Sequence, residues 1–471
     1  MPPKLLFDPS YSSRLSKSDY DRDNSCAQFL SDHSRIIFSS SFRRLVKKAQ
    51  VFSLESNTAV RNRLTHSLEV ADVGRTIARS VGLELVKIGR IDADDVPCLT
   101  SIVENACLMH DIGNPPFGHF GESAIQRWFK ELDKNKDKVK VDLTDDDLND
   151  QINFDGNPQG FRIATRLHCE RDEFSLNLTC ATLLASIKYP HSQKPDKGHF
   201  AKKIGFFQSE NDVYESICST TGHTPGRRYF LAYLMELADD CCYCLSDIAD
   251  SFEKQIISLE QYTTAVSTLC QEANLDPSSL ACLTCAGDFD FRFQVAIPLT
   301  KLIIEQSTVF FVENLDTFLN GEASPISKSI EAGKYLKCLN DFAKKYIYTS
   351  LEVERIELSG FHVVTSLLNQ FGKLLALERT DFQSFVEGGE NHKRGELDFE
   401  WRLFNRLSKR MLLAYSFAVD QFDDDKSCDN MEFTARVRLL VDFISGMTDE
   451  SAKELHQILT GTDSMIAPTA W

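Results

Sequence analysis

Residues 108–116 read Leu-Met-His-Asp-Ile-Gly-Asn-Pro-Pro, and they contain the first candidate functional residues of the chain. An apolar helix runs into the adjacent His110 and Asp111 and then stops at a glycine and two prolines, which cannot continue it. The dipeptide therefore lies in the last helical turn, where the helix dipole is negative and favours a cation. An imidazole beside a carboxylate suits a divalent metal ion. On its own, the pair fits a solvent-facing histidine and a capping aspartate equally well, so a metal site requires further ligands.

Two other positions supply such ligands. His66 follows residues 61–65, which read Arg-Asn-Arg-Leu-Thr, at the start of a predicted helix with an apolar face. Downstream, Asp239 and Asp240 are adjacent within an apolar helical stretch, and buried acids are costly unless they are paired or bound to metal. One or both acids could instead face solvent. Together these positions form an H…HD…D set that leaves coordination open for water and phosphate.

Helical periodicity dominates the rest of the chain, and strand signals are weak. We expect an all-α fold with at most minor β-hairpins. The predicted helices span residues 36–51, 65–85, 96–112, 159–167, 179–189, 228–252, 259–273, 361–375, 400–417 and 433–446. Three polar, charged stretches are typical of exposed loops, namely residues 133–150, 190–203 and 388–395.

The length of 471 residues suggests more than one domain. We expect a polar N-terminal segment over residues 1–24 and a helical catalytic domain over 25–275, with an exposed insertion near 133–150. A second helical region would cover 276–435. The last segment, 436–471, would form a helix that packs back near the active site.

Composition limits the function and the cellular location. The chain has 52 Lys and Arg against 69 Asp and Glu, a net charge of -17, so it is a poor general binder of polyanions. An anionic substrate would need local arginine, lysine or a metal ion. Residues 1–24 lack the apolar core of a signal peptide, and no apolar run approaches the roughly 18 residues of a membrane span. The sequence therefore predicts a cytoplasmic protein that does not bind a membrane.

The 14 cysteines are scattered, and several fall within apolar helical runs. Cysteine is often buried as a small apolar residue. We expect no disulfide framework in a large cytoplasmic chain. The single C-x-x-C, Cys282 and Cys285, has no second pair at zinc-finger spacing and indicates ordinary thiols.

The H…HD…D set resembles the signature of the HD superfamily of metal-dependent phosphohydrolases. A closer resemblance is to the bacterial deoxyguanosinetriphosphate triphosphohydrolases (dGTPases), and it covers most of the chain in the same order. The matching stretches are residues 32–37, 41–45, 50–52, 61–69, 110–122, 154–162, 188–190, 238–243 and 446–449. The insertion at 133–150 and the region from about 275 to 395 have no counterpart that we can anchor, as is common for variable surface segments.

The resemblance implies that His66, His110, Asp111 and Asp239 hold one divalent metal ion. Mg or Mn is the expected metal, and Co, Ni and Fe are alternatives. Asp240 is the competing carboxylate. We favour Asp239 because the family places its ligand directly after the small residue, which leaves Asp240 a supporting or salt-bridging role.

His119 and Glu122 are the expected catalytic residues. They are three residues apart and would share one face of a helix. Histidine can transfer a proton near neutral pH, and a glutamate can orient it. The matching pair is implicated in catalysis in the dGTPases. From the residues alone, a surface histidine and a glutamate favoured by a helix N-terminus are an equal alternative.

Phosphate binding must rely on separate cations, because the P-loop pattern G-x-x-x-x-G-K-[ST] is absent from the sequence. Arg63 lies about one turn before His66 and could hold the α-phosphate. Lys188 and Tyr189 match the Lys-Tyr element of the family and would contact the triphosphate. A helix C-terminal cation is the alternative role for Lys188.

Other substrate contacts are implied by the resemblance. Tyr243 follows the favoured aspartate ligand by four residues and would pack on the sugar, excluding a 2′-hydroxyl. Gln50 would lie near the 3′-hydroxyl. Asn157 and Gln159 match a polar loop of the family, although turn formation also explains that loop. Arg436 is a weaker candidate from a neighbouring subunit, and a surface arginine is its simpler interpretation.

The implied reaction is hydrolysis of a deoxynucleoside triphosphate (dNTP), with dGTP preferred, to a deoxynucleoside and inorganic triphosphate. The alternatives are a broad dNTPase, another HD-domain nucleotide phosphohydrolase, or a nucleic-acid-binding regulator that senses nucleotides. The resemblance also implies a homo-oligomer, a hexamer in some relatives, and single-stranded DNA as a candidate effector. Small basic clusters at 43–44, 47–48 and 227–228 could bind DNA, although charge runs are usually solvated faces.

Overall fold

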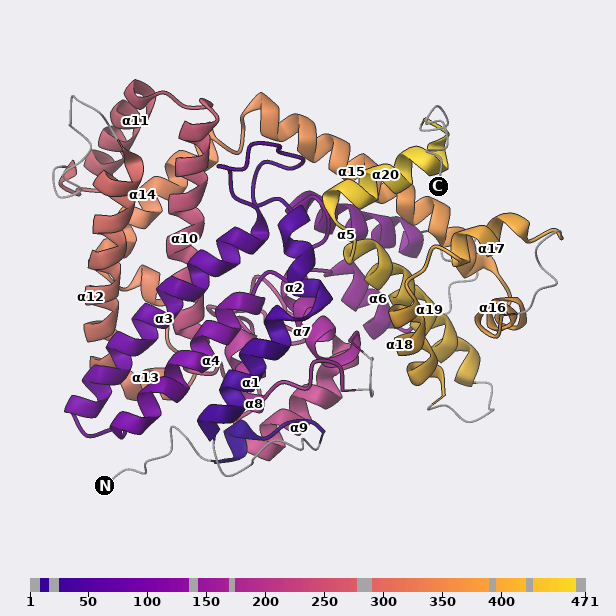
Figure 1. Cartoon of the computed structure of the whole chain (residues 1–471), viewed down its shortest axis with the longest axis horizontal. Helices are drawn as coiled ribbons and strands as arrows, with labels where there is room; N and C mark the ends of the chain where they lie inside the picture. The colour runs from indigo at the N-terminus through magenta and orange to yellow at the C-terminus, as the bar shows by residue number, and fades with distance from the viewer. Residues whose placement is uncertain are drawn as a thin grey trace.

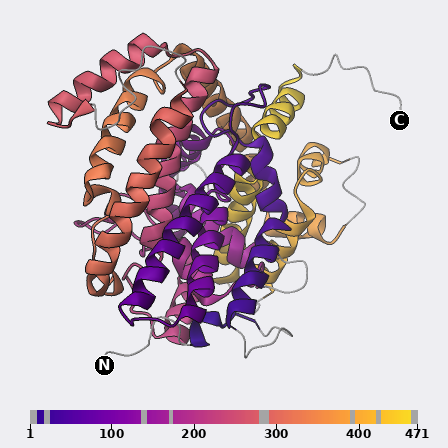
Figure 2. The same ribbon diagram turned by 60° about the vertical axis from the view of Figure 1, so that its left-hand side comes forward.

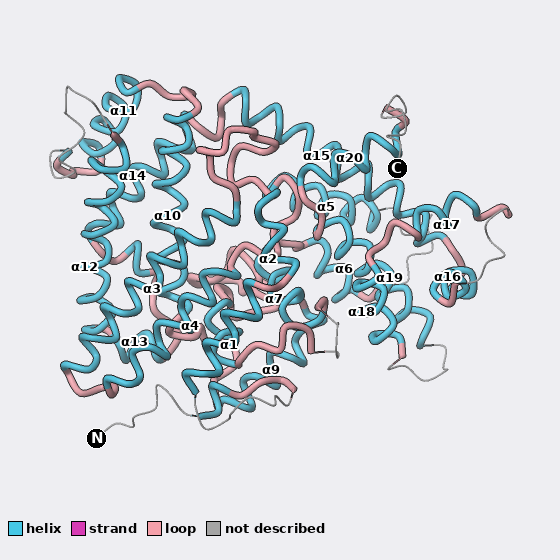
Figure 3. The backbone as a smooth tube through the Cα atoms, in the orientation of Figure 1, coloured by secondary structure: helices cyan, strands magenta, loops and turns pink. Residues whose placement is uncertain are grey.

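The computed structural model describes residues 9–16, 25–134, 143–168, 174–277, 290–388, 395–420 and 427–462. Within these ranges every regular element is a helix (Figure 3). The only β pairing there is two isolated bridges, Arg14 with Thr179 and Ala49 with Asn62. The predicted all-α fold is confirmed.

The α-helices, in chain order, are α1 (Ser25–Ile37), α2 (Ser40–Arg44), α3 (Arg63–Lys87), α4 (Val96–Met109), α5 (Gly118–Lys134), α6 (Asp145–Ile152), α7 (Gly156–Arg166), α8 (Cys180–Ser186), α9 (Asn211–Thr221), α10 (Ala232–Glu253), α11 (Leu259–Glu272), α12 (Ile297–Glu313), α13 (Leu315–Leu319), α14 (Glu331–Tyr346), α15 (Leu351–Phe371), α16 (Arg379–Val386), α17 (Asp398–Phe404), α18 (Lys409–Val419), α19 (Ser427–Ser445) and α20 (Asp449–Thr460). Short turns of 3-10 or π type are η2 (Pro9–Ser12), η3 (Leu45–Lys47), η4 (Ala93–Asp95), η5 (Gln208–Glu210), η7 (Arg292–Ala296), η8 (Ile326–Lys328) and η9 (Gly372–Ala376).

The helices are organised around two hydrophobic cores. The first core is centred on the antiparallel pair α3 and α4, against which α1, α8, α10 and α12 pack (Figure 1). The second core joins α5 to α15, α18 and α19, with α20 lying along α15. Figure 2 shows the N-terminal helices lying between the α11–α14 group and the C-terminal helices. The loops that link α4, α5 and α7 therefore lie where the two cores meet.

Close backbone approach at two glycines brings the key segments together. A Cβ on Gly74 in α3 would lie 2.5 Å from Sγ of Cys107 in α4, so glycine permits the tight α3–α4 contact. A Cβ on Gly113 would lie 2.1 Å from the carbonyl oxygen of Gly156 and the amide nitrogen of Gly160. The loop after α4 therefore rests directly on the N-terminus of α7, since only glycine leaves room there.

Two of the predicted helices are interrupted. The helix predicted over 36–51 is broken because the side chain of Ser39 caps a new helix, accepting from the amide of Phe42. The stretch is divided among α1, α2 and η3. The helix predicted over 400–417 is similarly divided between α17 and α18. In both cases apolar periodicity continues across a short turn, which is why the sequence suggested one helix.

The prediction of an exposed loop over 133–150 is also partly wrong. Residues 135–142 lie outside the described ranges, but α6 begins at Asp145, with Thr144 as its N-cap. Acidic residues in a first helical turn are favoured by the helix dipole, so the acidic run begins a helix. Asp150 of this helix is buried and accepts hydrogen bonds from the amides of Gln208 and Ser209.

Two further expectations need correction. Cys26 and Cys98 form a disulfide between α1 and α4, which the sequence did not lead us to expect. The C-x-x-C cysteines lie outside the described residues. The segment Arg292–Glu313 has a mean hydropathy of 1.5 and is long and apolar enough to cross a membrane by those measures, contrary to the prediction of no such run. One third of its most apolar 18-residue window (33%) is buried, and its α12 part packs on α3 and α14. Helices in the core of a soluble protein can have the same length and hydropathy.

Candidate metal centre and substrate pocket

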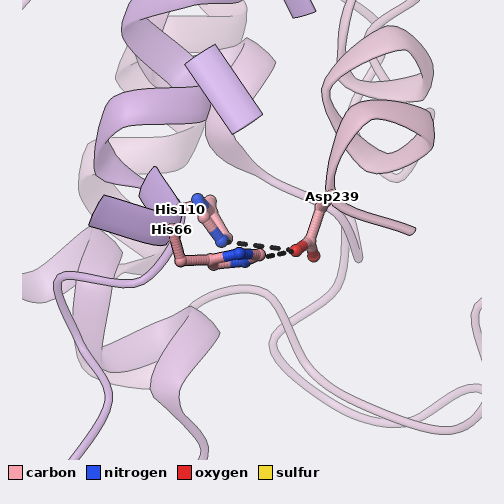
Figure 4. Close-up of side chains that lie close together, drawn as sticks. All are labelled: His66, His110 and Asp239. Carbon is pink, nitrogen blue, oxygen red and sulfur yellow. Dashed lines mark hydrogen bonds and ion pairs between the residues drawn. The ribbon is translucent and has the colours of Figure 1, made fainter. Parts of the chain in front are cut away.

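Three side chains from three helices converge on one point (Figure 4). His66 lies in α3, His110 follows the last turn of α4, and Asp239 lies in α10. Nε2 of each histidine is 3.4 Å from Oδ1 of Asp239, and one ligand atom from each residue lies within 4.8 Å of the others. Donors that share one ion at about 2.1 Å are separated by about 3.0–3.4 Å. The group therefore has the spacing of a metal centre.

The protonation of the site also fits a metal ion. Nδ1 of His110 lies 2.6 Å from the carbonyl of Cys107, which fixes the ring with Nε2 directed at Asp239. This Nε2 is buried and has no hydrogen-bond partner among the described residues. Burial alone would raise the pKa of Asp239, but Lys188 and His110 outweigh it and hold that pKa well below its usual value. An ionised carboxylate thus faces Nε2 of a buried imidazole. Burial would lower the pKa of His110, but Asp111 and Asp239 outweigh it and raise that pKa, so a metal ion bound here would take the place of the Nε2 proton.

Asp111, the fourth expected ligand, stands beside this group. Its Oδ2 accepts a hydrogen bond of 2.8 Å from Nη1 of Arg63 and lies 3.6 Å from Nε2 of His110. Burial would raise the pKa of Asp111, but Arg63 is the main influence that holds it far below normal. The structure therefore brings three expected ligands together and leaves the fourth one contact away, engaged by arginine.

The two adjacent acids of α10 point to different surroundings. Asp239 faces the histidines, whereas Oδ2 of Asp240 accepts a hydrogen bond of 2.7 Å from the hydroxyl of Ser327. The geometry thus groups Asp239, not Asp240, with His66 and His110.

A cavity of about 340 Å³ opens over the three converging side chains. The expected site residues other than Gln159 and Arg436 line it; they are Gln50, Arg63, His66, His110, Asp111, His119, Glu122, Asn157, Lys188, Tyr189, Asp239 and Tyr243. These residues span nearly 200 positions of sequence, so the fold gathers them from α3, α5, α7, α10 and the intervening loops. Gln159 lies outside the cavity and donates to Asp442 of α19 at 2.9 Å.

Three cations, Arg63, Lys188 and Lys203, line this cavity. Nζ of Lys188 forms an ion pair with Oδ2 of Asp239. Burial would lower the pKa of Lys188, but Asp239 outweighs it and raises that pKa, so the lysine stays charged. Lys203, which the sequence did not single out, lines the same cavity and pairs with Asp155 at 2.5 Å. With Arg63, these lysines can offset the charge of a polyphosphate.

His119 and Glu122 form a hydrogen-bonded pair at the start of α5. Nδ1 of His119 is 3.0 Å from Oε2 of Glu122. The glutamate side chain is 7% exposed and its other oxygen accepts from the amide of Gly156 at 2.8 Å, whereas the histidine side chain is 72% exposed. A fixed carboxylate therefore orients an accessible imidazole, as proton transfer requires.

One wall of the cavity was missed by the sequence reasoning. Tyr348 and three residues at the start of α15, namely Val353, Ile356 and Glu357, line it. The hydroxyl of Tyr348 donates to the buried Asp247 at 2.5 Å, and its ring centroid lies 6.2 Å from that of Tyr243. Asp239, Tyr243 and Asp247 follow one another at intervals of four residues along α10. This spacing places Asp247 on the same face of the helix, and it could have identified Asp247 from the sequence.

Arg436 is buried, so its interpretation as a surface arginine is wrong. Its guanidinium is buried, pairs with Glu432 at 2.5–3.0 Å and donates to the carbonyl of Leu377 at 2.6 Å. It also lies 4.6 Å from the ring centre of Phe382. Arg436 therefore fastens α19 to the neighbouring segments and does not line the cavity of its own chain.

Comparison with known proteins agrees with the geometry. The family described as HD domain matches residues 63–151, which include His66, His110 and Asp111. The chain is also similar to the deoxyguanosinetriphosphate triphosphohydrolase of Serratia proteamaculans (strain 568). The identity is 34% over 93% of this chain and 94% of that protein.

Proposed function

The chain belongs to the family of deoxyguanosinetriphosphate triphosphohydrolases, and we propose that it hydrolyses dGTP to deoxyguanosine and inorganic triphosphate with one divalent metal ion. The observation that carries the proposal is the group of His66, His110 and Asp239 at the bottom of a cavity that also presents Arg63, Lys188 and Lys203. A metal-ligating group beside three cations is what the reacting end of a nucleoside triphosphate needs.

We propose that His66, His110 and Asp239 hold the metal ion, and that Asp111 joins them when a substrate phosphate takes its place on Arg63. Mg or Mn is the expected ion, because water and phosphate oxygens would fill the remaining positions. The bound ion would supply Lewis-acid polarisation of the α-phosphate.

The protein groups around the triphosphate have separable tasks. Arg63, Lys188 and Lys203 would neutralise the phosphate oxygens and the charge that develops on them. Water adds to the α-phosphorus, the bond from phosphorus to the 5′ oxygen breaks, and one proton passes from the water to that oxygen. His119, held by Glu122, is suited to relay this proton.

The sugar would lie between Tyr243 of α10 and the wall formed by Tyr348 and the start of α15. We propose that the rings of Tyr243 and Tyr348, whose centroids are 6.2 Å apart in the cavity lining, pack on the sugar and exclude a 2′-hydroxyl by their bulk. Oε1 of Gln50 is buried in the cavity and has no hydrogen-bond partner among the described residues, so it can accept from a 3′-hydroxyl. These two features favour a deoxyribose.

Glu357 supports a preference for guanine. Asp111, Asp239 and Glu122 are paired with cations or histidine. Glu357 is half-buried in the wall, and within the described ranges it forms no ion pair. Guanine presents two adjacent N–H donors that a carboxylate accepts together, whereas adenine presents an acceptor at the same ring position. We propose that Glu357 reads this edge.

Product analysis tests the proposed reaction. Purified protein would be incubated with each dNTP and Mg or Mn. We expect inorganic triphosphate and deoxynucleoside, formed fastest from dGTP. Release of pyrophosphate and deoxynucleoside monophosphate would contradict cleavage between the α-phosphorus and the 5′ oxygen.

For location and assembly, we propose a cytoplasmic homo-oligomer. Sedimentation of the purified chain tests the assembly, and a monomer at micromolar concentration would contradict it. The basic clusters expected to bind DNA are engaged within the chain: Arg43 with the carbonyl of Phe38, Lys47 with Glu450, Arg227 with Glu322 and Arg228 with Glu236. Single-stranded DNA as an effector stays a prediction, which a salt-dependent binding measurement would decide.

A further inference from the structure

The junction of α19 and α20, residues 445–450, contacts loops on two sides of the cavity; we call it the C-terminal corner. Its residues 446–449, Gly-Met-Thr-Asp, carry part of the family resemblance but take no part in the proposed chemistry. Thr448 caps α20, and Asp449 is the first residue of that helix. No residue of the corner lines the cavity. The corner could therefore affect the reaction only through what it holds.

Asp449 joins two loops that do line the cavity. Its Oδ1 accepts a hydrogen bond of 3.0 Å from the amide of Phe117, and its Oδ2 accepts one of 3.1 Å from the amide of Ala49. The carboxylate is buried. Ala49 directly precedes Gln50, and Phe117 precedes Gly118 and His119. One carboxylate thus sets the separation of the loop that bears Gln50 from the loop that bears His119.

The backbone at Phe117 depends on this contact. Its φ is +62°, in the left-handed region, and that of Gly118 is +55°. Such a conformation is uncommon for a bulky residue and costs about 1–2 kcal/mol. It is retained where the surroundings determine it, and here the amide of Phe117 is tied to Asp449 while the ring is buried. The turn decides the direction in which α5 leaves and therefore where His119 stands.

The Ala49 side is tied to the metal centre. The carbonyl of Lys48 accepts from the amide of Arg63 at 2.9 Å, and Ala49 forms an isolated bridge with Asn62. Nζ of Lys48 donates to the carbonyl of Ser445 at 3.0 Å and also to that of Asn114, in the loop after Asp111. The corner is therefore linked to the start of α3 and to the loop that follows the His-Asp pair.

We propose that Asp449 is a positioning residue for the hydrolysis: its carboxylate holds the Ala49–Gln50 and Phe117–His119 loops in the register that lets His119 reach the reacting oxygens. Asp449 does not touch the substrate. The kinetic part of this inference rests on the proposed function, whereas the structural part does not.

The test compares Asp449→Asn with two matched variants. Asparagine keeps the shape but presents an NH₂ group to one of the two amide donors, so one hydrogen bond is lost. Glu450→Gln changes the neighbouring acid, which among the described residues pairs only with the exposed Lys47. Thr448→Ala weakens the start of the same helix through its capping box and leaves both Asp449 contacts in place.

We expect Asp449→Asn to lower kcat about 10-fold to 100-fold with KM changed by no more than about threefold. Hydrogen exchange at the amides of Ala49 and Phe117 should accelerate at least about tenfold in this variant. Both quantities should stay near wild type in Glu450→Gln. In Thr448→Ala the melting temperature should fall, while kcat and the two amides stay near wild type.

Unchanged exchange at both amides in Asp449→Asn would overturn the proposal. An equal loss of kcat in Thr448→Ala would also overturn it, because the effect would then be helix stability alone. If the wild-type protein hydrolyses no dNTP, the proposed function fails, and the exchange measurement decides whether Asp449 holds the two loops.

Discussion

The bottom of the cavity and its wall are built in contrasting ways. At the bottom, charged groups are buried and each is paired: Asp111 with Arg63, and Asp239 with Lys188. In the wall, Val353 is buried, whereas Ile356 and Glu357 are half-buried and Glu357 forms no ion pair within the described ranges. Removing one partner of a buried ion pair carries a large penalty, whereas a half-buried, unpaired side chain such as Glu357 can change with little effect on folding. Chemistry therefore belongs to the bottom of the cavity and substrate choice to the wall.

The largest effect is expected at the bottom. Asp239→Asn should lower triphosphate release from dGTP at least about 1,000-fold, because a metal ion contributes several kcal/mol of charge stabilisation and the amide is a poor ligand. Asp240→Asn is the matched control, since its carboxylate contacts Ser327 instead of the histidines. Bound metal would be measured alongside activity by elemental analysis of the purified variants. Equal losses in the two variants would contradict the choice of Asp239.

The proton-relay pair comes next. His119→Ala should lower kcat about 100-fold and leave the melting temperature nearly unchanged, because the imidazole is exposed. Glu122→Gln should lower kcat less, since an amide can still contact the ring, but it should destabilise the fold because its carboxylate caps the amide of Gly156. The measurements are steady-state kinetics and thermal melting. A His119→Ala enzyme with wild-type kcat would remove histidine from the mechanism.

The same contrast explains what the sequence could predict. The residues at the bottom are rare types at fixed spacing: a His-Asp pair at a helix end closed by Gly and Pro-Pro, a histidine after Arg-Leu-Thr, and two acids in an apolar helix. The residue types and their spacing indicate this chemistry before the fold is known. The wall residues Tyr348, Val353 and Glu357 are ordinary residues of an amphipathic helix and the turn before it. Only packing across some 100 residues of sequence places them at the site, so no local pattern marks them.

Burial explains the errors. The sequence favours a surface position for Arg436 because it does not show what covers a side chain, yet Glu432 lies four residues earlier on the same helix and forms its ion pair. The helix break at Ser39 and the helix at Asp145 follow from caps, which short polar residues provide and apolar periodicity hides.

The wall should respond in specificity and not in rate. Glu357→Gln should lower the preference for dGTP over dATP about tenfold in kcat/KM, because one carboxylate–donor contact of about 1–3 kcal/mol is lost. The rate with dATP should stay near wild type. The control is Glu354→Gln, one turn earlier on α15, which is exposed and lies outside the cavity. If Glu357→Gln leaves the ratio of dGTP to dATP unchanged, the base is read elsewhere.

The smallest kinetic effect is expected at the junction of wall and bottom. Tyr348→Phe keeps the ring beside Tyr243 but removes the hydroxyl that donates to Asp247 at 2.5 Å. Burial, the main cause, already raises the pKa of Asp247 well above normal, and the loss of this donor raises that pKa further. The buried carboxyl is left short of a partner, so the free energy of unfolding should fall by about 1–3 kcal/mol. KM for dGTP should rise only about twofold to threefold, which corresponds to less than 1 kcal/mol of binding free energy.

Urea unfolding and steady-state kinetics check the two values for Tyr348→Phe. Tyr346→Phe is the control, because the hydroxyl of Tyr346 makes no hydrogen bond within the described ranges. A large rise in KM with unchanged stability would show instead that the hydroxyl binds substrate, and Tyr348 would then belong with the residues at the bottom of the cavity.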